Sequence, residues 1–217
     1  MGAAYTPHVC SVNGQVRCEG TQCGDGDNRY GGICDKDGCD FNSWRMGDRN
    51  FLGVGKTVDT SKKITVVTQF LTSNNQTSGT LTEIRRLYVQ NGRVIANSKT
   101  NVPGMATYDS ISDQYCKEAK VAFGDNDSFG RLGGMRAMGQ AFARNGMVLV
   151  MSIWDDHEAR MLWLDSEYPL DKDPNAPGIS RGPCPRDSGD PKVVEAQHPD
   201  ATVVFSNIKY GPIGSTY

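Results

Sequence analysis

Adjacent carboxylates and two tryptophans stand together in one short segment of the chain. Asp155 and Asp156 directly follow an apolar run, and Trp163 comes nine residues after Trp154. The apolar run, residues 147–154, predicts a strand. Carboxylates hydrogen-bond sugar hydroxyls, and indole faces cover the apolar faces of pyranose rings. The segment therefore predicts one wall of a sugar-binding cleft.

The same segment has two further interpretations. Asp156 and Glu158 would share one face of a strand, at a spacing usable by the acid/base and nucleophile of a retaining glycosidase. Alternatively the tryptophans hold a glucan on a non-catalytic β-sandwich, and nothing is cut. The rest of the chain has to distinguish between these interpretations.

Length and charge exclude several classes of function. The chain has 217 residues, enough for one large domain, and a net charge of −2 with its basic residues mixed among acidic ones. A surface of such mixed charge is not expected to attract nucleic acid or an anionic membrane. Apolar runs stay well short of the roughly 18 residues needed to cross a bilayer. We therefore expect no nucleic acid and no membrane among the partners, and no cofactor.

The cysteines predict an extracellular protein. Seven are present, six of them within the first 116 residues and in loops rich in Gly and Asp. This is typical of a secreted disulfide framework, and sequons at Asn75 and Asn126 fit secretion. No signal peptide is visible, and the cysteine count is odd, so we expect that the beginning of the protein lies upstream of residue 1.

The first cysteines also allow a metal interpretation. Their spacing, Cys18-x4-Cys23 followed by Cys34-x4-Cys39, could supply four zinc ligands. The intervals are longer than the usual two-residue knuckle, and five acidic residues lie among them. Disulfides are therefore the favoured interpretation, and we expect no metal.

Turn residues and apolar runs predict the elements that would position these side chains. An Asn91-Gly92 turn indicates a β-hairpin, and Ser112 and Gly124 bracket a helical pattern. Residues 168–186 form a long loop of a length typical of functional loops. The predicted strands are 64–71, 82–89, 93–95, 147–154 and 201–208, and the predicted helices are 112–123 and 135–144. Few strands, short helices and long loops predict an all-β antiparallel sandwich whose loops build a cleft.

Six segments carry a more specific signal. They are TPHVC (6–10), DNRYGGICDKDGCDFNSWRMG (27–47), TVDTSKKITVVTQF (57–70), YVQNG (88–92), GMVLVMSIWDDHEARMLWLDSEYP (146–169) and VVFSNIKYGPIGST (203–216). Together and in this order they resemble glycoside hydrolase family 7, the secreted cellulases of fungal type, and in particular its cellobiohydrolases. The resemblance implies a jelly-roll (concanavalin-like) β-sandwich with long cleft-forming loops. Residues 1–217 would be a partial catalytic domain without its N-terminal half, and no linker or binding module is visible.

The resemblance implies cellulose degradation by a protein that is a monomer when full length. Family members hydrolyse β-1,4-glucosidic bonds with retention, and cellobiohydrolases release cellobiose from chain ends. The reaction uses two carboxyl groups about 5–5.5 Å apart. In the family these lie in a Glu-x-Asp-x-x-Glu motif, which this sequence lacks and which we expect just upstream of Met1. The chain alone should thus be inactive. Endo-action within the same family is the alternative.

The resemblance implies roles for individual residues. His8 matches the family histidine near the acid/base and is a possible auxiliary of catalysis. The residues implied to bind substrate or product are Arg29, Asp37, Asp40, Arg45, Trp154, Asp155, Asp156, Trp163 and Arg181. The implied disulfides are Cys10–Cys34, Cys18–Cys23 and Cys39–Cys116, with Cys184 joined to a cysteine upstream of residue 1.

The sequence also departs from the family. His157 and Glu158 stand where family members often carry Tyr, so this part of the wall is more polar. The loop between Cys23 and Arg29 is short, which argues against full closure of a tunnel. The long loop of residues 168–184, in contrast, resembles the tunnel-forming cellobiohydrolases.

Overall fold

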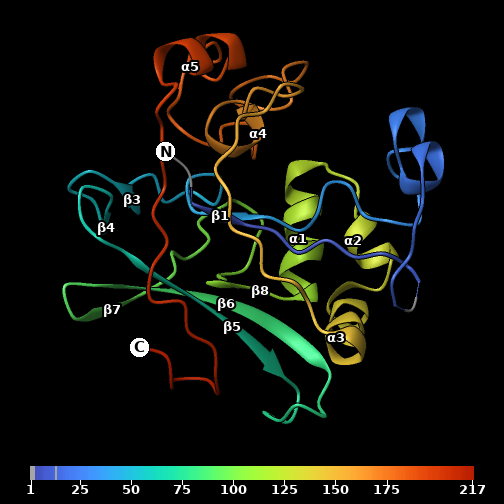
Figure 1. Cartoon of the computed structure of the whole chain (residues 1–217). Coiled ribbons are helices and arrows are strands. Elements are labelled where there is room, and N and C mark those ends of the chain that lie inside the picture. Colours follow the sequence, from blue (N-terminus) through green and yellow to red (C-terminus); the bar gives the residue numbers. More distant parts are fainter. Residues whose placement is uncertain (1–2, 13) are drawn as a thin grey trace.

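The largest sheet of the protein is built around a hairpin (Figure 1). The computed structural model describes residues 3–12 and 14–217. Strand β5 (Thr65–Thr72) pairs antiparallel with β6 (Leu81–Gln90) along almost its whole length. The chain then reverses at Asn91-Gly92, where both residues have positive φ angles of 53° and 72°. Two such residues in succession are typical of the tight turn that fits the twist of a hairpin, so the predicted hairpin is confirmed.

The remaining strands are short. They are β1 (Ala4–Tyr5), β2 (Phe41–Asn42), β3 (Leu52–Gly53), β4 (Val58–Asp59), β7 (Arg93–Ala96) and β8 (Ser110–Ile111). Both β7 and β8 pair with β6 and complete the four-stranded sheet. The pair β1–β2 is antiparallel and the pair β3–β4 is parallel.

Both predicted helices are present. Helix α1 (Asp113–Phe123) begins where the Ser112 side chain accepts the Tyr115 N–H, and it ends at Gly124 in a left-handed conformation. Helix α3 (Gly134–Asn145) packs on β6. The other helical segments are η1 (Gly20–Cys23), η2 (Gly26–Asn28), α2 (Ser128–Arg131), α4 (Leu162–Asp165) and α5 (Pro191–Gln197). No helix among the described residues is both long enough and apolar enough to cross a bilayer.

The core joins β2, α1 and α3. The Phe41 ring stacks between the Tyr5 and Tyr115 rings, at centroid distances of 5.7 and 5.2 Å, and all three are buried. Met135 is fully buried, and Phe142 meets the ring of Phe70 on β5 edge to face. One face of α3 therefore packs on the core, as the helical spacing of its apolar residues indicates.

Three disulfides staple the N-terminal loops to this core. The bonds are Cys10–Cys34, Cys18–Cys23 and Cys39–Cys116, so these implied pairings are confirmed. The four cysteines considered as zinc ligands all take part in these bonds. Because a cysteine binds zinc as a free thiolate, the interpretation of these four cysteines as zinc ligands is wrong. The implied partner of Cys184 stays a prediction.

Two predicted strands are absent. Residues 147–154 and 201–208, hereafter the apolar segments, belong to no sheet of the described chain, and Figure 1 draws both as plain tubes. Their side chains are exposed, with Val148 and Val204 each 86% accessible. The residue types favour strands, but a strand needs a neighbour to take its N–H and C=O groups, and the described residues offer none here.

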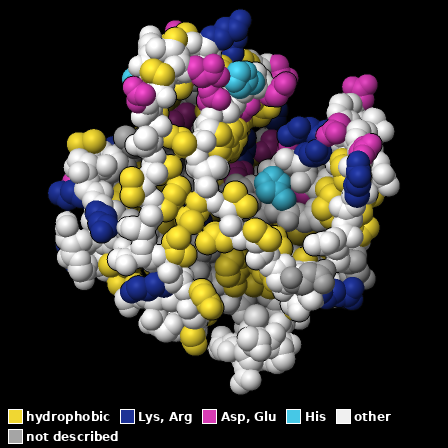
Figure 2. Space-filling model, in the orientation of Figure 1, with side chains coloured by type: hydrophobic (Ala, Val, Ile, Leu, Met, Phe, Trp, Pro, Cys, Tyr) yellow, Lys and Arg dark blue, Asp and Glu magenta, His cyan; other side chains and the backbone are white. Residues whose placement is uncertain are grey.

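The apolar segments leave hydrophobic side chains on the surface, as the central part of Figure 2 shows. Among the described residues the strands form one four-stranded sheet and two short pairs, without a second large sheet facing the first. The jelly-roll sandwich therefore remains a prediction for a longer protein.

Candidate functional site

Arg45 is the centre of a buried charge cluster. Its side chain is 3% exposed, and its Nη1 and Nη2 lie 2.5 Å from Asp40 Oδ1 and 2.7 Å from Asp125 Oδ2. Its Nε donates to the Gly178 carbonyl at 2.9 Å, and the guanidinium lies 4.2 Å from the centre of the Phe123 ring. Every nitrogen of the guanidinium therefore has a partner, which fixes its orientation.

Arg181 extends this cluster toward the tryptophans. Its Nη1 lies 3.7 Å from Asp40 Oδ2 and donates to the Trp163 carbonyl at 3.5 Å. Its Nε donates to the Tyr168 carbonyl at 3.3 Å, and its guanidinium lies 5.8 Å from the centre of the Tyr168 ring. Predicted residues from three separate parts of the sequence thus meet at one place.

The charges of the cluster stabilise one another. Burial alone would raise the pKa of Asp40, but Arg45 and Arg181 hold it below its ordinary value. Burial would lower the pKa of Arg45, and Asp40 and Asp125 more than compensate, so it is raised. The pKa of Arg181 is lowered by burial and by the neighbouring Arg45. Asp40 and Arg45 therefore each stabilise the charged form of the other.

Asn42 explains why these loops meet. It is fully buried on β2, where its Oδ1 accepts the N–H groups of Trp44 and Arg45. Its Nδ2 donates to the carbonyls of Leu164 and Arg181, 122 and 139 residues further along the chain. A buried amide with all these bonds specifies one arrangement, because any other arrangement leaves polar groups unpaired.

The two tryptophans predicted to hold sugar are stacked on each other. The ring centroids of Trp154 and Trp163 are 6.2 Å apart and the planes are inclined by 24°. Asp156 Oδ2 accepts the indole N–H of Trp163 at 2.8 Å, which fixes the rotation of that ring. Trp154 is 57% exposed and Trp163 is partly buried, so an indole surface faces solvent.

Asp156 and Glu158 do not share the face of a strand. The Asp156 Oδ1 accepts the N–H groups of Glu158 and Ala159, both at 3.0 Å, so the chain turns here. Burial would raise the pKa of Asp156, but hydrogen bonds from the Ala159 N–H and the Trp163 indole lower it. The Asp156 carboxylate already accepts these three hydrogen bonds, and the two side chains do not share a strand face. The interpretation of Asp156 and Glu158 as a catalytic pair is therefore wrong.

Arg29 and Asp37 form a pair at the surface. The Arg29 Nε donates to Asp37 Oδ1 at 2.7 Å, and its Nη2 contacts the same oxygen. Burial would lower the pKa of Arg29, but Asp37 raises it, with a smaller contribution from Tyr168. The pair therefore lies within electrostatic reach of Tyr168, the residue that accepts from Arg181.

His8 is exposed beside a buried carboxylate. Its Nδ1 lies 3.1 Å from the carbonyl oxygen of Asp35, whose side chain is buried. Burial raises the pKa of Asp35 more than the Gly38 N–H and the charge of His8 lower it. Gly38 has a φ of 70°, and a Cβ there would stand 2.7 Å from the His8 ring, so this turn requires glycine.

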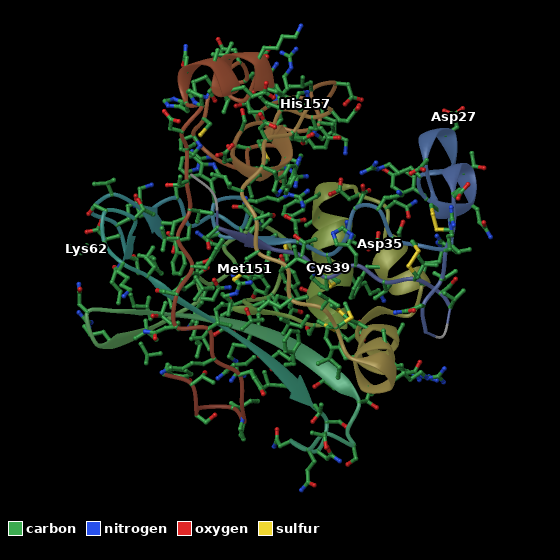
Figure 3. All side chains as sticks on the ribbon, in the orientation of Figure 1. Asp27, Asp35, Cys39, Lys62, Met151 and His157 are labelled. Atoms are coloured by element: carbon green, nitrogen blue, oxygen red, sulfur yellow. A yellow bond between two sulfur atoms is a disulfide. The ribbon has the colours of Figure 1, made fainter. Side chains whose placement is uncertain are left out.

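Asp155 contacts His157 and not the charge cluster. Its Oδ1 lies 3.6 Å from the Nε2 of His157, which also lies 2.9 Å from Glu195 Oε1. Figure 3 places His157 at the end of the molecule near α5, away from the labelled Asp35 and Cys39. The structure thus separates Asp155 from its neighbour Asp156, although both were predicted to bind sugar.

Sequence reasoning missed several residues of the site. Asp125, Asn42, Asp35 and Tyr168 each complete a contact of a predicted residue. Asp35 lies in a segment quoted for the resemblance, but its burial has no signature in a single sequence. Asp125 follows the terminating glycine of α1 and gives no signal until the fold places it 2.7 Å from Arg45.

Comparison with known proteins identifies the family. The profile of glycosyl hydrolase family 7 matches residues 1–217. The chain belongs to glycosyl hydrolase family 7. The crystal structure of a family 7 cellobiohydrolase from Daphnia pulex is 54% identical in sequence, with a TM-score of 0.94 over 99% of this chain and 49% of that chain.

Two further family 7 structures give the range of similarity. The cellobiohydrolase of Melanocarpus albomyces, solved in complex with cellotetraose, is 46% identical, with a TM-score of 0.88 over 99% of this chain and 48% of that one. An endocellulase of Humicola insolens is 34% identical, with a TM-score of 0.73 over 91% of this chain and 44% of that one. The chain thus spans about half the length of the family 7 proteins it matches.

Proposed function

We propose that this chain is the substrate- and product-binding half of a secreted cellulase that hydrolyses β-1,4-glucosidic bonds with retention and releases cellobiose. The linked set of Trp163, Arg181, Asp40 and Arg45 carries the proposal. Arg181 donates to the Trp163 backbone carbonyl and shares Asp40 with Arg45, so the residue that carries the indole is tied to both guanidinium groups. A glucose unit needs an apolar plane against its ring face and fixed donors for its hydroxyls; Trp163 offers the plane and Arg181 the donors, while Asp40, held by the buried Arg45, fixes the position of Arg181.

Preorganisation is the physical advantage of this arrangement. Asp156 fixes the Trp163 indole, and Asp40 fixes two guanidiniums, before any sugar arrives. The cost of ordering these side chains is met during folding, so more of the contact energy remains for binding. We assign Arg29 and Asp37, near Tyr168, to hydroxyls at the rim of the same site.

The chemistry needs two carboxyl groups about 5–5.5 Å apart. We assign them to the other half of the family 7 domain, since this sequence lacks the Glu-x-Asp-x-x-Glu motif. His8 would lie beside the acid/base, oriented by its bond to the Asp35 backbone. In the whole domain, proposed to be a jelly-roll sandwich, the apolar segments would gain strand neighbours, which accounts for their composition.

Exo-action is favoured over endo-action. Identity is 54% and 46% to the two cellobiohydrolases and 34% to the endocellulase. The long loop of residues 168–184 packs against the site, where Ser180 accepts the Trp44 indole N–H and Gly178 accepts from Arg45. The three disulfides support secretion, because such bonds persist in oxidising compartments.

A direct test uses the 217-residue chain. We expect it to quench its tryptophan fluorescence on binding cellobiose and to release no chromophore from a chromogenic cellobioside. Trp163→Ala should shift the quenching to much higher cellobiose concentrations. Trp44→Phe is the matched control, because Trp44 contacts Ser180 and lies outside the stacked pair. Turnover by the chain alone, or cellobiose binding unchanged by Trp163→Ala, would overturn the proposal.

A further inference from the structure

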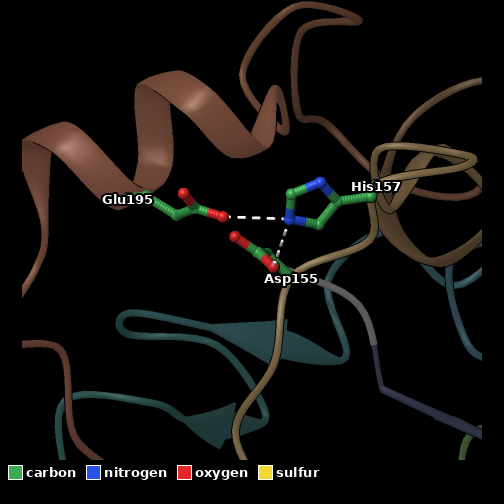
Figure 4. A group of neighbouring side chains, drawn as sticks. All are labelled: Asp155, His157 and Glu195. Atoms are coloured by element: carbon green, nitrogen blue, oxygen red, sulfur yellow. Dashed lines mark hydrogen bonds and ion pairs between the residues drawn. The ribbon is translucent and has the colours of Figure 1, made fainter.

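Three ligand-type side chains converge near helix α5, outside the proposed sugar site. Asp155 lies just before the turn of residues 157–160, His157 lies in that turn, and Glu195 lies on α5, 38 residues beyond His157. Figure 4 shows the His157 ring pointing between the two carboxylates, with the same nitrogen facing both. His157 Nε2 is 2.9 Å from Glu195 Oε1 and 3.6 Å from Asp155 Oδ1.

These separations fit the coordination of a small dication. With bonds of about 2.1 Å, two ligands of a tetrahedral ion lie about 3.4 Å apart. The observed nitrogen–oxygen distances of 2.9 and 3.6 Å bracket that value. All three ligand atoms lie within 4.8 Å of one another. Small rotations of exposed side chains would therefore form the site without moving the backbone.

The donor set selects the class of ion. An imidazole nitrogen with two carboxylate oxygens suits zinc and similar divalent transition metals, whereas calcium and magnesium prefer oxygen ligands throughout. With a neutral imidazole the three ligands carry two negative charges, which a dication neutralises. Acidic side chains gather at this end of the molecule in Figure 2.

We propose that Asp155, His157 and Glu195 bind a divalent transition-metal ion and so clip α5 to the segment that carries the stacked tryptophans. Asp155 is bonded in sequence to Trp154 and to Asp156, the residue that holds the Trp163 indole. The bound ion would restrain this segment through contacts that do not involve the proposed sugar-binding residues Trp163 and Arg181. The inference is independent of the proposed cellulase function, because metal binding needs no turnover.

Without metal the contact is weak. His157 and Glu195 are 66% and 57% exposed, and exposed pairs of this kind contribute little to stability. A metal that binds the folded chain stabilises it in proportion to its occupancy, so the melting temperature should rise with zinc concentration. Acidification should weaken binding, because protons compete for the imidazole and the carboxylates.

The test is calorimetric titration of the chelator-treated 217-residue chain with Zn²⁺ alone. We expect one ion per chain with a micromolar Kd, unchanged by millimolar Ca²⁺ or Mg²⁺. His157→Asn and Glu195→Gln should each weaken binding at least about tenfold, a loss of at least about 1.4 kcal/mol. His198→Asn is the matched control, because His198 is an exposed histidine at the end of the same helix and lies outside the cluster.

Three results would overturn the proposal. The first is no saturable uptake by the unaltered chain. The second is uptake that survives both His157→Asn and Glu195→Gln. The third is an equal loss in His198→Asn, which would indicate nonspecific histidine binding. Circular dichroism of each variant checks the fold, and cellobiose quenching provides a separate readout, so failure of this site and failure of the sugar site are distinguishable.

Discussion

Arg45→Met should destabilise the fold by about 3 kcal/mol. The substitution keeps an unbranched apolar side chain but removes the guanidinium that lies between Asp40 and Asp125 and over the Phe123 ring. Removing one partner of a buried ion pair typically costs about 3–5 kcal/mol. The lower end applies here, because Arg181 still faces Asp40 at 3.7 Å. Lys172 likewise remains 3.6 Å from Asp125.

Urea unfolding followed by tryptophan fluorescence measures this effect. With a slope of about 2 kcal/mol per molar urea, the midpoint should fall by about 1.5 M at constant slope. Trp44 is a local reporter, since it adjoins Arg45 in sequence and its indole bonds Ser180. If Arg45→Met unfolds the chain completely, Arg45→Lys should cause a smaller loss of stability. Lysine keeps the positive charge but lacks the planar set of donors of the guanidinium.

A rescue variant separates unpaired charge from lost packing. The combination of Arg45→Met with Asp40→Asn and Asp125→Asn removes all three charges. The two neutral amides remove the unpaired negative charges that Arg45→Met leaves, so stability should return in part; Arg181 and Lys172 lose their carboxylate partners, which keeps the recovery below the unaltered chain. The reasoning is refuted if Arg45→Met costs under about 1 kcal/mol, or if the triple variant is no more stable than the single one.

Four further predictions concern the sugar site, one disulfide, Asp40 and the apolar segments. Trp163→Ala should weaken cellobiose binding about thirtyfold in a fluorescence titration, as expected for loss of an aromatic anchor worth about 2 kcal/mol. Replacing both Cys39 and Cys116 by Ala should lower stability by about 4 kcal/mol in urea, because the bond closes a 77-residue separation; an unchanged midpoint would contradict this. The pKa of Asp40 is lower in the folded chain than its ordinary value of 3.8, so its contribution is present above that pH and is lost as pH falls through the folded value. Asp40→Asn should therefore flatten the acid limb of a stability–pH profile, and an identical profile would argue against the pairing. The apolar segments should make the chain bind a hydrophobic dye such as ANS, whereas a cooperative melt without dye binding would show that they are covered.

Local signals in the sequence were sufficient for local structure. Asn91-Gly92 gave the hairpin, and Ser112 with Gly124 gave the ends of α1, because turns and caps depend on neighbours in sequence. The disulfide pairing came from the family resemblance, since spacing alone leaves many pairings open.

The predicted strands of the apolar segments failed for a physical reason. Their residue types favour an extended chain, but a strand is completed by a partner that lies elsewhere in the fold. Likewise Asp156 and Glu158 have the spacing of a shared strand face, yet the Asp156 side chain accepts the backbone N–H of Glu158 and forms a turn. At this position the Asp156 side chain, rather than a neighbouring strand, accepts the backbone N–H, so a turn forms in place of a strand.

The sequence by itself determined the family, the elements with local signals and the absence of the catalytic motif. Only the tertiary structure decided which charges meet. Arg45 contacts Asp125, 80 residues away in the sequence, and His157 contacts Glu195, 38 residues away. Such contacts have no periodicity or spacing to reveal them, because they are set by how buried groups such as Asn42 lock distant loops together. The chemical type of each residue is known from the sequence, whereas the packed fold determines which residues contact one another.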